Sequence, residues 1–102
     1  MVIYNVTTNV QEEVHGDWLK WMKAEYIPAM LDTGKFTKAL MTKVLSKEPM
    51  GGITYSVQYT AESMAYINTF YVEDHANMVA KTAIFKGKIV EFSTELQVID
   101  EQ

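Results

Sequence analysis

Residues 10–36 are the stretch that most constrains the fold of this chain. They carry both tryptophans, one of the two histidines and an internal proline. At about 100° per residue, the apolar side chains fall on one broad side, which predicts a long amphipathic helix. That side comprises Val14, His15, Trp18, Leu19, Met22, Tyr26, Ala29 and Met30. Such a helix must cover another apolar surface, and the strand-like segments before and after it provide a sheet.

Residues that favour helix ends or interrupt helices occur at both ends of this segment and within it. Asn9 followed by Glu12 resembles a capping box, in which a polar side chain satisfies the first free N–H groups. Pro28 has no N–H to donate to the carbonyl of Ala24, so we expect a kink there. Gly34 is expected to end the helix, because glycine tolerates the positive φ found just after a helix.

Alternating apolar and polar residues predict four strands, at residues 2–10, 36–45, 53–60 and 88–99. A second helix is expected over residues 61–86, with Thr60 as its cap and Gly87 as its end. Its inner stripe would comprise Met64, Ile67, Tyr71, His75, Met78, Val79 and Thr82. In the last strand, one face carries apolar side chains and the other carries Glu91, Ser93, Glu95 and Gln97.

The resulting order is βαββαβ in one domain spanning residues 1–102. Right-handed crossovers then give a four-stranded antiparallel sheet. Because each strand offers mainly one apolar face, both helices are expected on the same face, which is a ferredoxin-like α+β fold. The face that the helices leave uncovered would either be exposed to solvent or pack on a second sheet. It would carry Asn5, Thr7, Thr54, Ser56, Gln58, Ser93 and Glu95.

Composition narrows the classes of partner. The net charge of −4 argues against binding to nucleic acid, which needs a basic face. The chain has no cysteine, and therefore neither disulfides nor a thiol nucleophile. No apolar run reaches the roughly 20 residues of a membrane span, and no signal peptide is apparent. We therefore expect a cytoplasmic protein without membrane or nucleic-acid partners.

Several motifs together resemble the DUF4286 family, a bacterial family of unknown function in the dimeric α/β-barrel superfamily. The resemblance covers nearly the whole chain and rests on Ile3–Val6, His15 with Trp18, Trp21–Met22, Ile27–Pro28, Thr33–Phe36, Gly51–Tyr59 and Glu95–Leu96. At one position the chain departs from the family pattern, since Tyr26 stands where a histidine often precedes the Ile-Pro pair. The resemblance implies a ferredoxin-like fold and a homodimer whose two sheets face each other, with no assigned reaction.

The wider relatives implied by this resemblance include cofactor-free quinone-forming monooxygenases and haem-degrading monooxygenases. The haem-degrading enzymes use an asparagine on the first strand, with a tryptophan and a histidine on the second helix. Asn5 and His75 lie on the corresponding predicted elements, but the second helix has no tryptophan. The match to that constellation is therefore incomplete.

Both histidines fall on predicted apolar helix faces, which makes them candidate site residues. A desolvated histidine in a cleft can accept a proton near neutral pH, and His15 is our candidate base. A core histidine that is bonded to a carbonyl or a tyrosine is the alternative interpretation. The candidate ligand-binding residues, which can equally be core filling or an interface rim, are Asn5, Trp18, Trp21, Tyr26, Tyr55 and His75.

Two functional hypotheses remain open. In the first, the domain is a dimeric ligand-binding or structural module with a cleft between helices and sheet. In the second, the same cleft is an enzyme site of the monooxygenase or isomerase type, acting on an aromatic or quinone-type substrate with His15 as base. His15, Glu25 and His75 do not have a recognised metal-ligand spacing, so no metal or other cofactor is predicted.

Overall fold

The computed structural model describes residues 1–102, which form four strands and two helical rods. The strands are β1 (Val2–Val10), β2 (Lys38–Lys43), β3 (Ile53–Ala61) and β4 (Ile89–Gln97). The first rod joins η1 (Glu12–Val14), α1 (His15–Trp21), the π-helical turn η2 (Met22–Tyr26) and α2 (Ile27–Asp32). The second rod joins α3 (Met64–Glu73), α4 (His75–Lys81) and η3 (Thr82–Phe85).

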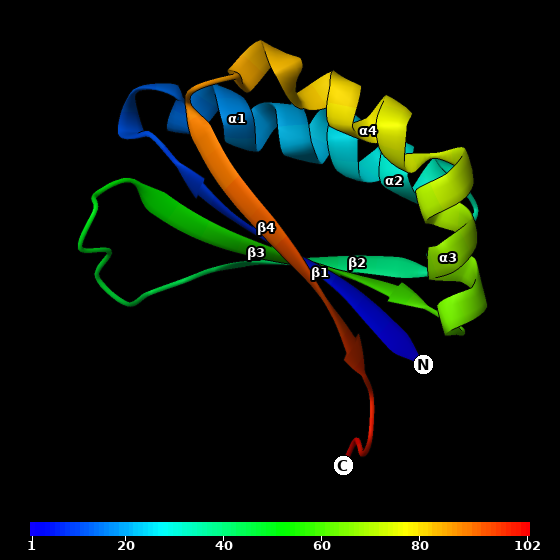
Figure 1. Ribbon diagram of the computed structural model, residues 1–102. Coiled ribbons are helices and arrows are strands. Elements are labelled where there is room, and N and C mark those ends of the chain that lie inside the picture. The colour runs from blue at the N-terminus through cyan, green and yellow to red at the C-terminus, as the bar shows by residue number, and fades with distance from the viewer.

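The four strands make one antiparallel sheet in the order β2-β3-β1-β4. Both rods lie on the same face of this sheet, and the other face has no cover (Figure 1). The predicted ferredoxin-like α+β fold is confirmed. None of the helices combines the length and the apolarity that a membrane crossing requires.

The core lies between the rods and the covered face of the sheet. Strand alternation sends every second side chain of β1 and β3 toward the rods, and these side chains meet the apolar stripes of the helices. Aromatic residues dominate the contact: the Tyr4 ring lies 6.0 Å from that of Phe36 and 5.5 Å from that of Phe70. The buried apolar residues are Tyr4, Val10, Trp18, Met22, Met30, Phe36, Tyr55, Val57, Tyr59, Ala61, Ile67, Phe70, Met78 and Phe85.

The first rod is helical from Glu12 to Asp32 and is irregular just before Pro28. The N–H of Ile27 bonds to the carbonyl of Met22, five residues earlier, as expected of a π-helical turn. The proline comes directly after this turn and has no N–H of its own to bond. Gly34, with a φ of 78°, follows the helix end as predicted.

The predicted cap of this rod is wrong. Asn9 belongs to β1, and its side-chain amide donates to the carbonyl of Gly51 at 3.1 Å and to Thr54 Oγ1 at 3.0 Å. The strand therefore runs to Val10, and no side chain caps the helix that follows. Asn9 instead holds the β2–β3 loop against β1.

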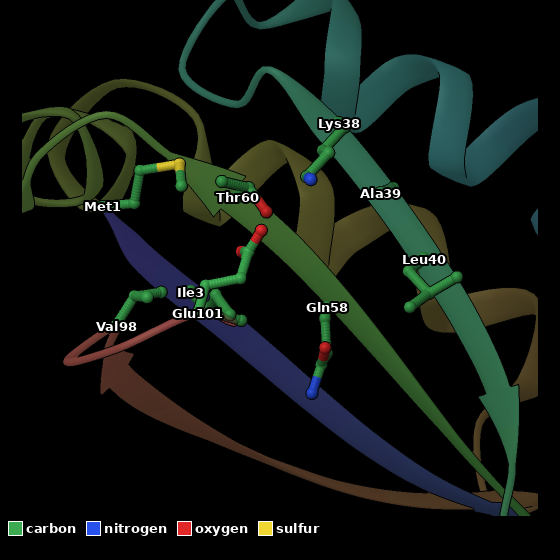
Figure 2. A pocket seen from close by; sticks show the side chains of 9 residues that line it. All are labelled: Met1, Ile3, Lys38, Ala39, Leu40, Gln58, Thr60, Val98 and Glu101. Atoms are coloured by element: carbon green, nitrogen blue, oxygen red, sulfur yellow. The ribbon is translucent and has the colours of Figure 1, made fainter.

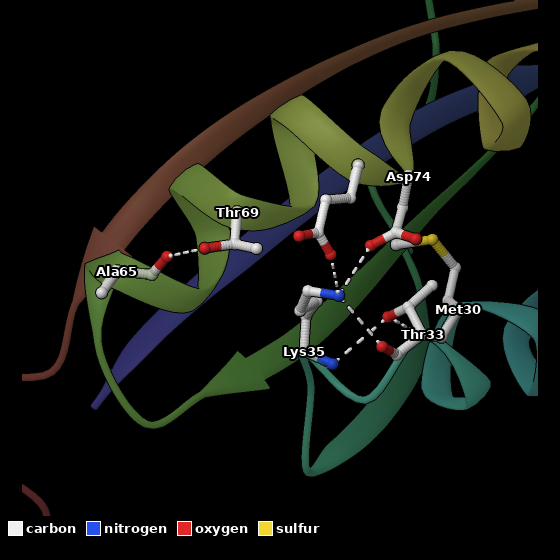
Figure 3. Close-up of polar contacts among 7 residues, drawn as sticks. Met30, Thr33, Lys35, Ala65, Thr69 and Asp74 are labelled. Atoms are coloured by element: carbon white, nitrogen blue, oxygen red, sulfur yellow. Dashed lines mark hydrogen bonds and ion pairs between the residues drawn. The ribbon is translucent and has the colours of Figure 1, made fainter.

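The second rod is shorter than predicted and is broken at Asp74. Thr60 lies within β3, and the helix begins only at Met64. Lys35, which follows the first rod in the chain, contacts the second rod at this break. Its Nζ lies 3.0 Å from Glu73 Oε1 and 3.1 Å from Asp74 Oδ2 (Figure 3). The Asp74 contact is an ion pair rather than an aligned hydrogen bond, since that oxygen has no hydrogen-bond partner.

The orientation predicted for β4 is also wrong. Ser93 pairs with Val6 and Glu95 with Tyr4, so both point to the helical side and not to the uncovered face. The uncovered face instead receives apolar residues of this strand, and Val90 and Phe92 are 73% and 63% exposed. The physical reason is that β4 is an edge strand that the rods do not bury, so its apolar face need not point toward them.

Candidate ligand site between the helices and strand β4

Strand β4 brings carboxylates to the helical side of the sheet. Its register pairs Glu91 with Thr8 and Glu95 with Tyr4, and paired residues point to the same face. Thr8 Oγ1 donates to Glu91 Oε2 at 3.2 Å, and the Tyr71 hydroxyl donates to Glu95. A polar strip therefore runs along the edge of an otherwise aromatic core.

A small cavity opens where this strip meets the first rod. Its volume is about 10 Å³, which is close to the space that one water molecule needs. Apolar and polar side chains share its walls: Val6, Thr8, Trp18, Trp21, Met22, Tyr26, Val57, Tyr59, Thr82, Ile89 and Glu91. Apart from Thr8, Thr82, Glu91 and the tyrosine hydroxyls, this lining is apolar or aromatic.

The hydroxyl of Tyr59 is the least satisfied polar group in this cavity. The residue is only 1% exposed, and its hydroxyl has no hydrogen-bond partner in the protein. Burial raises the pKa of Tyr59, and the nearby Tyr26 and Glu91 raise it further. The hydroxyl therefore stays protonated at neutral pH, and it has a hydrogen to donate that no group of the protein accepts.

Glu91 lies at the rim of the same cavity and is partly withdrawn from water. This desolvation raises the pKa of Glu91, while the hydrogen bond from Thr8 and the charge of His75 act in the opposite direction. Its side chain still reaches solvent, so it can exchange protons with water. A carboxyl group held in this way can accept a proton or a hydrogen bond from a bound molecule.

Three further tyrosines around the strip also remain protonated. Burial raises the pKa of Tyr4, Tyr26 and Tyr71. For Tyr71 the hydrogen bond to Glu95 raises the pKa further. The region therefore holds tyrosine hydroxyls as donors opposite carboxylates as acceptors.

A wider groove lies on the other side of Trp21 and Tyr26. It has a volume of about 230 Å³ and is lined by Trp21, Glu25, Tyr26, Lys81 and Ile84. The rings of Trp21 and Tyr26 lie 4.9 Å apart and line both spaces. These two side chains are therefore shared by the groove and the inner cavity.

Three of the predicted ligand-binding residues meet at the inner cavity, namely Trp18, Trp21 and Tyr26. His75 does not line this cavity and lies edge-on to Phe70 and Tyr71, with ring centroids 5.9 and 5.7 Å away.

His15 and Tyr55 form a separate pair. His15 Nε2 and the Tyr55 hydroxyl share a hydrogen bond of 2.5 Å, and the two rings stack at 5.6 Å. Neither residue lines the inner cavity. This arrangement matches the core-histidine alternative, and a catalytic role for His15 stays a prediction.

Asn5 lies on the opposite face of the sheet from the two histidines' helices. Its neighbours in β1, Tyr4 and Val6, point toward the rods, so alternation sends Asn5 to the uncovered face. There it accepts a hydrogen bond of 2.6 Å from Ser56 Oγ. Asn5 and His75 therefore lie on opposite faces of the sheet, and a ligand-binding role for either residue stays a prediction.

The sequence interpretation missed Glu91 and Tyr59 as site residues. Tyr59 belongs to a regular alternating strand pattern and was interpreted as a residue of the hydrophobic core. Glu91 was predicted to lie on the solvent-exposed face of the last strand. No sequence signal was available for Glu91, because its placement depends on the register that pairs it with the inward-facing Thr8 of β1.

A larger hollow occupies the uncovered face of the sheet. It has a volume of about 320 Å³, and side chains from β1, β2, β3 and the C-terminal segment surround it (Figure 2). The lining residues are Met1, Ile3, Lys38, Ala39, Leu40, Gln58, Thr60, Val98 and Glu101. No group of three or more histidine or acidic side chains lies close enough to hold a metal ion.

Solved structures with the same fold are similar along their whole length. A dimeric ferredoxin-like protein from an uncultured marine organism has a TM-score of 0.70 and 12% identity, with 100% of this chain and 98% of that chain covered. An Arabidopsis thaliana protein has a TM-score of 0.75 and 14% identity, with 100% and 99% covered. The hydroxynitrile lyase from Passiflora edulis has a TM-score of 0.63 and 14% identity, with 98% and 97% covered.

At these identities the structural matches establish the fold alone. No curated protein matches the chain. The family model described as "Domain of unknown function (DUF4286)" matches residues 1–99, which is nearly the whole chain. The protein therefore belongs to the DUF4286 family.

Proposed function

We propose that the protein is a homodimeric small-molecule-binding domain whose ligand occupies the space between the first helical rod and strand β4. The observation that carries this proposal is Tyr59, which lines a cavity together with Glu91 and whose buried hydroxyl lacks a partner in the protein. A buried polar group without a partner costs about 1–3 kcal/mol. A site that binds a polar ligand group explains why such a group is kept in the core.

The surroundings support the same proposal. The cavity is lined mainly by aromatic and aliphatic side chains, with few polar groups among them, and the neighbouring groove adds the charged Glu25 and Lys81. This composition is typical of small-molecule sites, in which apolar walls bind and a few polar groups orient the ligand.

A ligand screen by thermal shift tests the proposal. We expect hits that raise the unfolding temperature of the wild type, because selective binding to the folded state stabilises it. The same hits should stabilise Tyr59→Phe less, since this change removes the hydroxyl and leaves the ring in place. Tyr66→Phe is the matched control, because Tyr66 is exposed on α3. Equal stabilisation of all three proteins would contradict the proposed site.

The homodimer is proposed to form through the uncovered face of the sheet. Leu40, Val90 and Phe92 all point to this face, and each is more than half exposed in the single chain. Leu40 lies on one edge strand and Val90 and Phe92 on the other, with polar side chains of β3 and β1 between them. Exposed apolar side chains that share one face are typical of protein interfaces. The description of one structural neighbour as a dimeric ferredoxin-like protein agrees with this arrangement.

An enzymatic role is the second candidate, and Glu91 favours it. Its carboxyl group has a raised pKa, is held by Thr8 and lies at the rim of the cavity, as expected of a general base. One neighbour of the same fold is a hydroxynitrile lyase. Recovery of a bound ligand in chemically changed form, with the change abolished in Glu91→Gln, would favour the enzyme. Recovery of the ligand unchanged would favour the binding module.

A further inference from the structure

We propose that the ligand is a neutral aromatic molecule with a hydroxyl group, which places the hydroxyl between Tyr59 and Glu91 and the ring beside Trp21 and Tyr26. This inference rests on the proposed function and names the chemical class that the same site binds. Three features support it: the size of the inner cavity, its hydrogen-bonding groups, and the groove that adjoins it.

The size of the inner cavity limits what enters it. At about 10 Å³ it accommodates a group no larger than a water molecule. A hydroxyl group has this size, whereas a carboxylate, an amide or a phosphate does not. The part of the ligand that reaches Tyr59 must therefore be a single small polar group.

The hydrogen-bonding groups of the cavity select among such polar groups. The protonated Tyr59 hydroxyl offers a hydrogen, and the Glu91 carboxylate accepts one. A ligand hydroxyl satisfies both at once, because it accepts from the tyrosine and donates to the carboxylate. An ether or carbonyl oxygen only accepts, and an anionic oxygen is repelled by Glu91.

The adjoining groove provides the space for the ring. Its volume of about 230 Å³ exceeds the roughly 150 Å³ of a cavity that is known to bind benzene. Trp21 and Tyr26 line both the groove and the inner cavity, so a ring in the groove lies beside both residues. The proposal requires the Trp21 side chain to turn, so that the two spaces join and the ligand hydroxyl reaches Tyr59.

Phenol, anisole and benzoate form a probe set that tests this inference. The three share one ring and differ in the polar group: a hydroxyl, a methylated oxygen and an anion. We expect phenol to bind the full-length protein at least fivefold more tightly than anisole or benzoate in NMR titrations. In Tyr59→Phe and in Glu91→Gln, the preference of phenol over anisole should fall to within twofold, while Tyr66→Phe should keep it.

Fluorescence locates the bound probe. Phenol should quench the tryptophan emission of the wild type, and most of this quenching should be lost in Trp21→Phe. Anisole that binds as tightly as phenol, or benzoate that binds most tightly, would overturn the ligand class while the proposed site stands. Absence of binding by all three probes, together with no hit in the thermal-shift screen, would overturn the proposed function as well.

Discussion

At the scale of single residues, the candidate site consists of polar groups that are poorly satisfied in the folded protein. Tyr59 has a buried hydroxyl without a protein partner, and Glu91 has a carboxyl group that is partly withdrawn from water. Both features reduce stability. Residues that weaken the fold in this way often belong to functional sites, where a ligand supplies the missing interactions.

The raised pKa of Glu91 predicts a specific pH dependence. Between its ordinary pKa and the raised value, the folded state binds more protons at Glu91 than the unfolded state does. Stability from this group is therefore lost as the pH rises through that window. Glu91→Gln removes the charge and keeps an oxygen that can accept from Thr8, so we expect a higher unfolding temperature at pH 7.

Thermal unfolding of the wild type and Glu91→Gln between pH 4 and pH 7 measures this effect. The difference between the two proteins should grow as the pH rises. A control variant, Glu62→Gln, changes an exposed carboxylate between β3 and α3 and should follow the wild type. A lower unfolding temperature for Glu91→Gln at pH 7 would contradict the assignment of a desolvated carboxylate.

At the scale of elements, the connection between β2 and β3 depends on close contact with β1. Gly51 and Gly52 both have positive φ, at 77° and 75°. A Cβ atom at Gly52 would lie 2.6 Å from Asn9 Oδ1 and 2.9 Å from the carbonyl oxygen of Val10, whereas one at Gly51 would meet nothing within 4 Å. The two glycines therefore share a positive φ and differ in the crowding around the added atom.

This pair predicts unequal costs for the same substitution. Gly51→Ala should lower the free energy of unfolding by about 1–2 kcal/mol, which is the typical cost of a left-handed conformation for an L-residue. Gly52→Ala should cost more, because the new methyl group displaces Asn9 and presses on the backbone of β1. Urea denaturation of the two variants measures the difference, and equal costs would show that β1 yields to the methyl group.

At the scale of the whole molecule, the two faces of the sheet differ in their cover. The rods bury one face, while the other presents apolar side chains and a hollow to solvent. A second copy that packs its own uncovered face here would bury these side chains in a symmetric interface.

The proposed interface predicts that one substitution dissociates the dimer. Phe92→Lys places a charge among the apolar side chains of the uncovered face, and a buried unpaired charge is strongly unfavourable. We expect the wild type to sediment with the mass of two chains and Phe92→Lys with the mass of one. Val72→Lys is the matched control, because Val72 is an apolar residue on helix α3 that is 87% exposed, against 63% for Phe92. A monomeric wild type at micromolar concentration would contradict the proposed interface.

The hydrophobic periods along the chain determined the type and order of the elements, and with them the fold. Periods of 2 and about 3.6 residues are local properties, and so are the glycines that end the helices, as Gly34 and Gly87 do. Local signals also predicted that Trp18 and Tyr26 lie on the inner side of the first rod, and both line the cavity together with the candidate residue Trp21.

Only the tertiary structure decided which face of β4 meets the rods and which polar residues enter the site. An edge strand with two differing faces can point either way, and the choice depends on pairing with β1 and on what covers each face. With this pairing, Glu91 points to the helical side of the sheet and Asn5 points to the uncovered face. The Tyr59 hydroxyl has no hydrogen-bond partner. These outcomes depend on contacts between residues far apart in the chain, which no local pattern encodes.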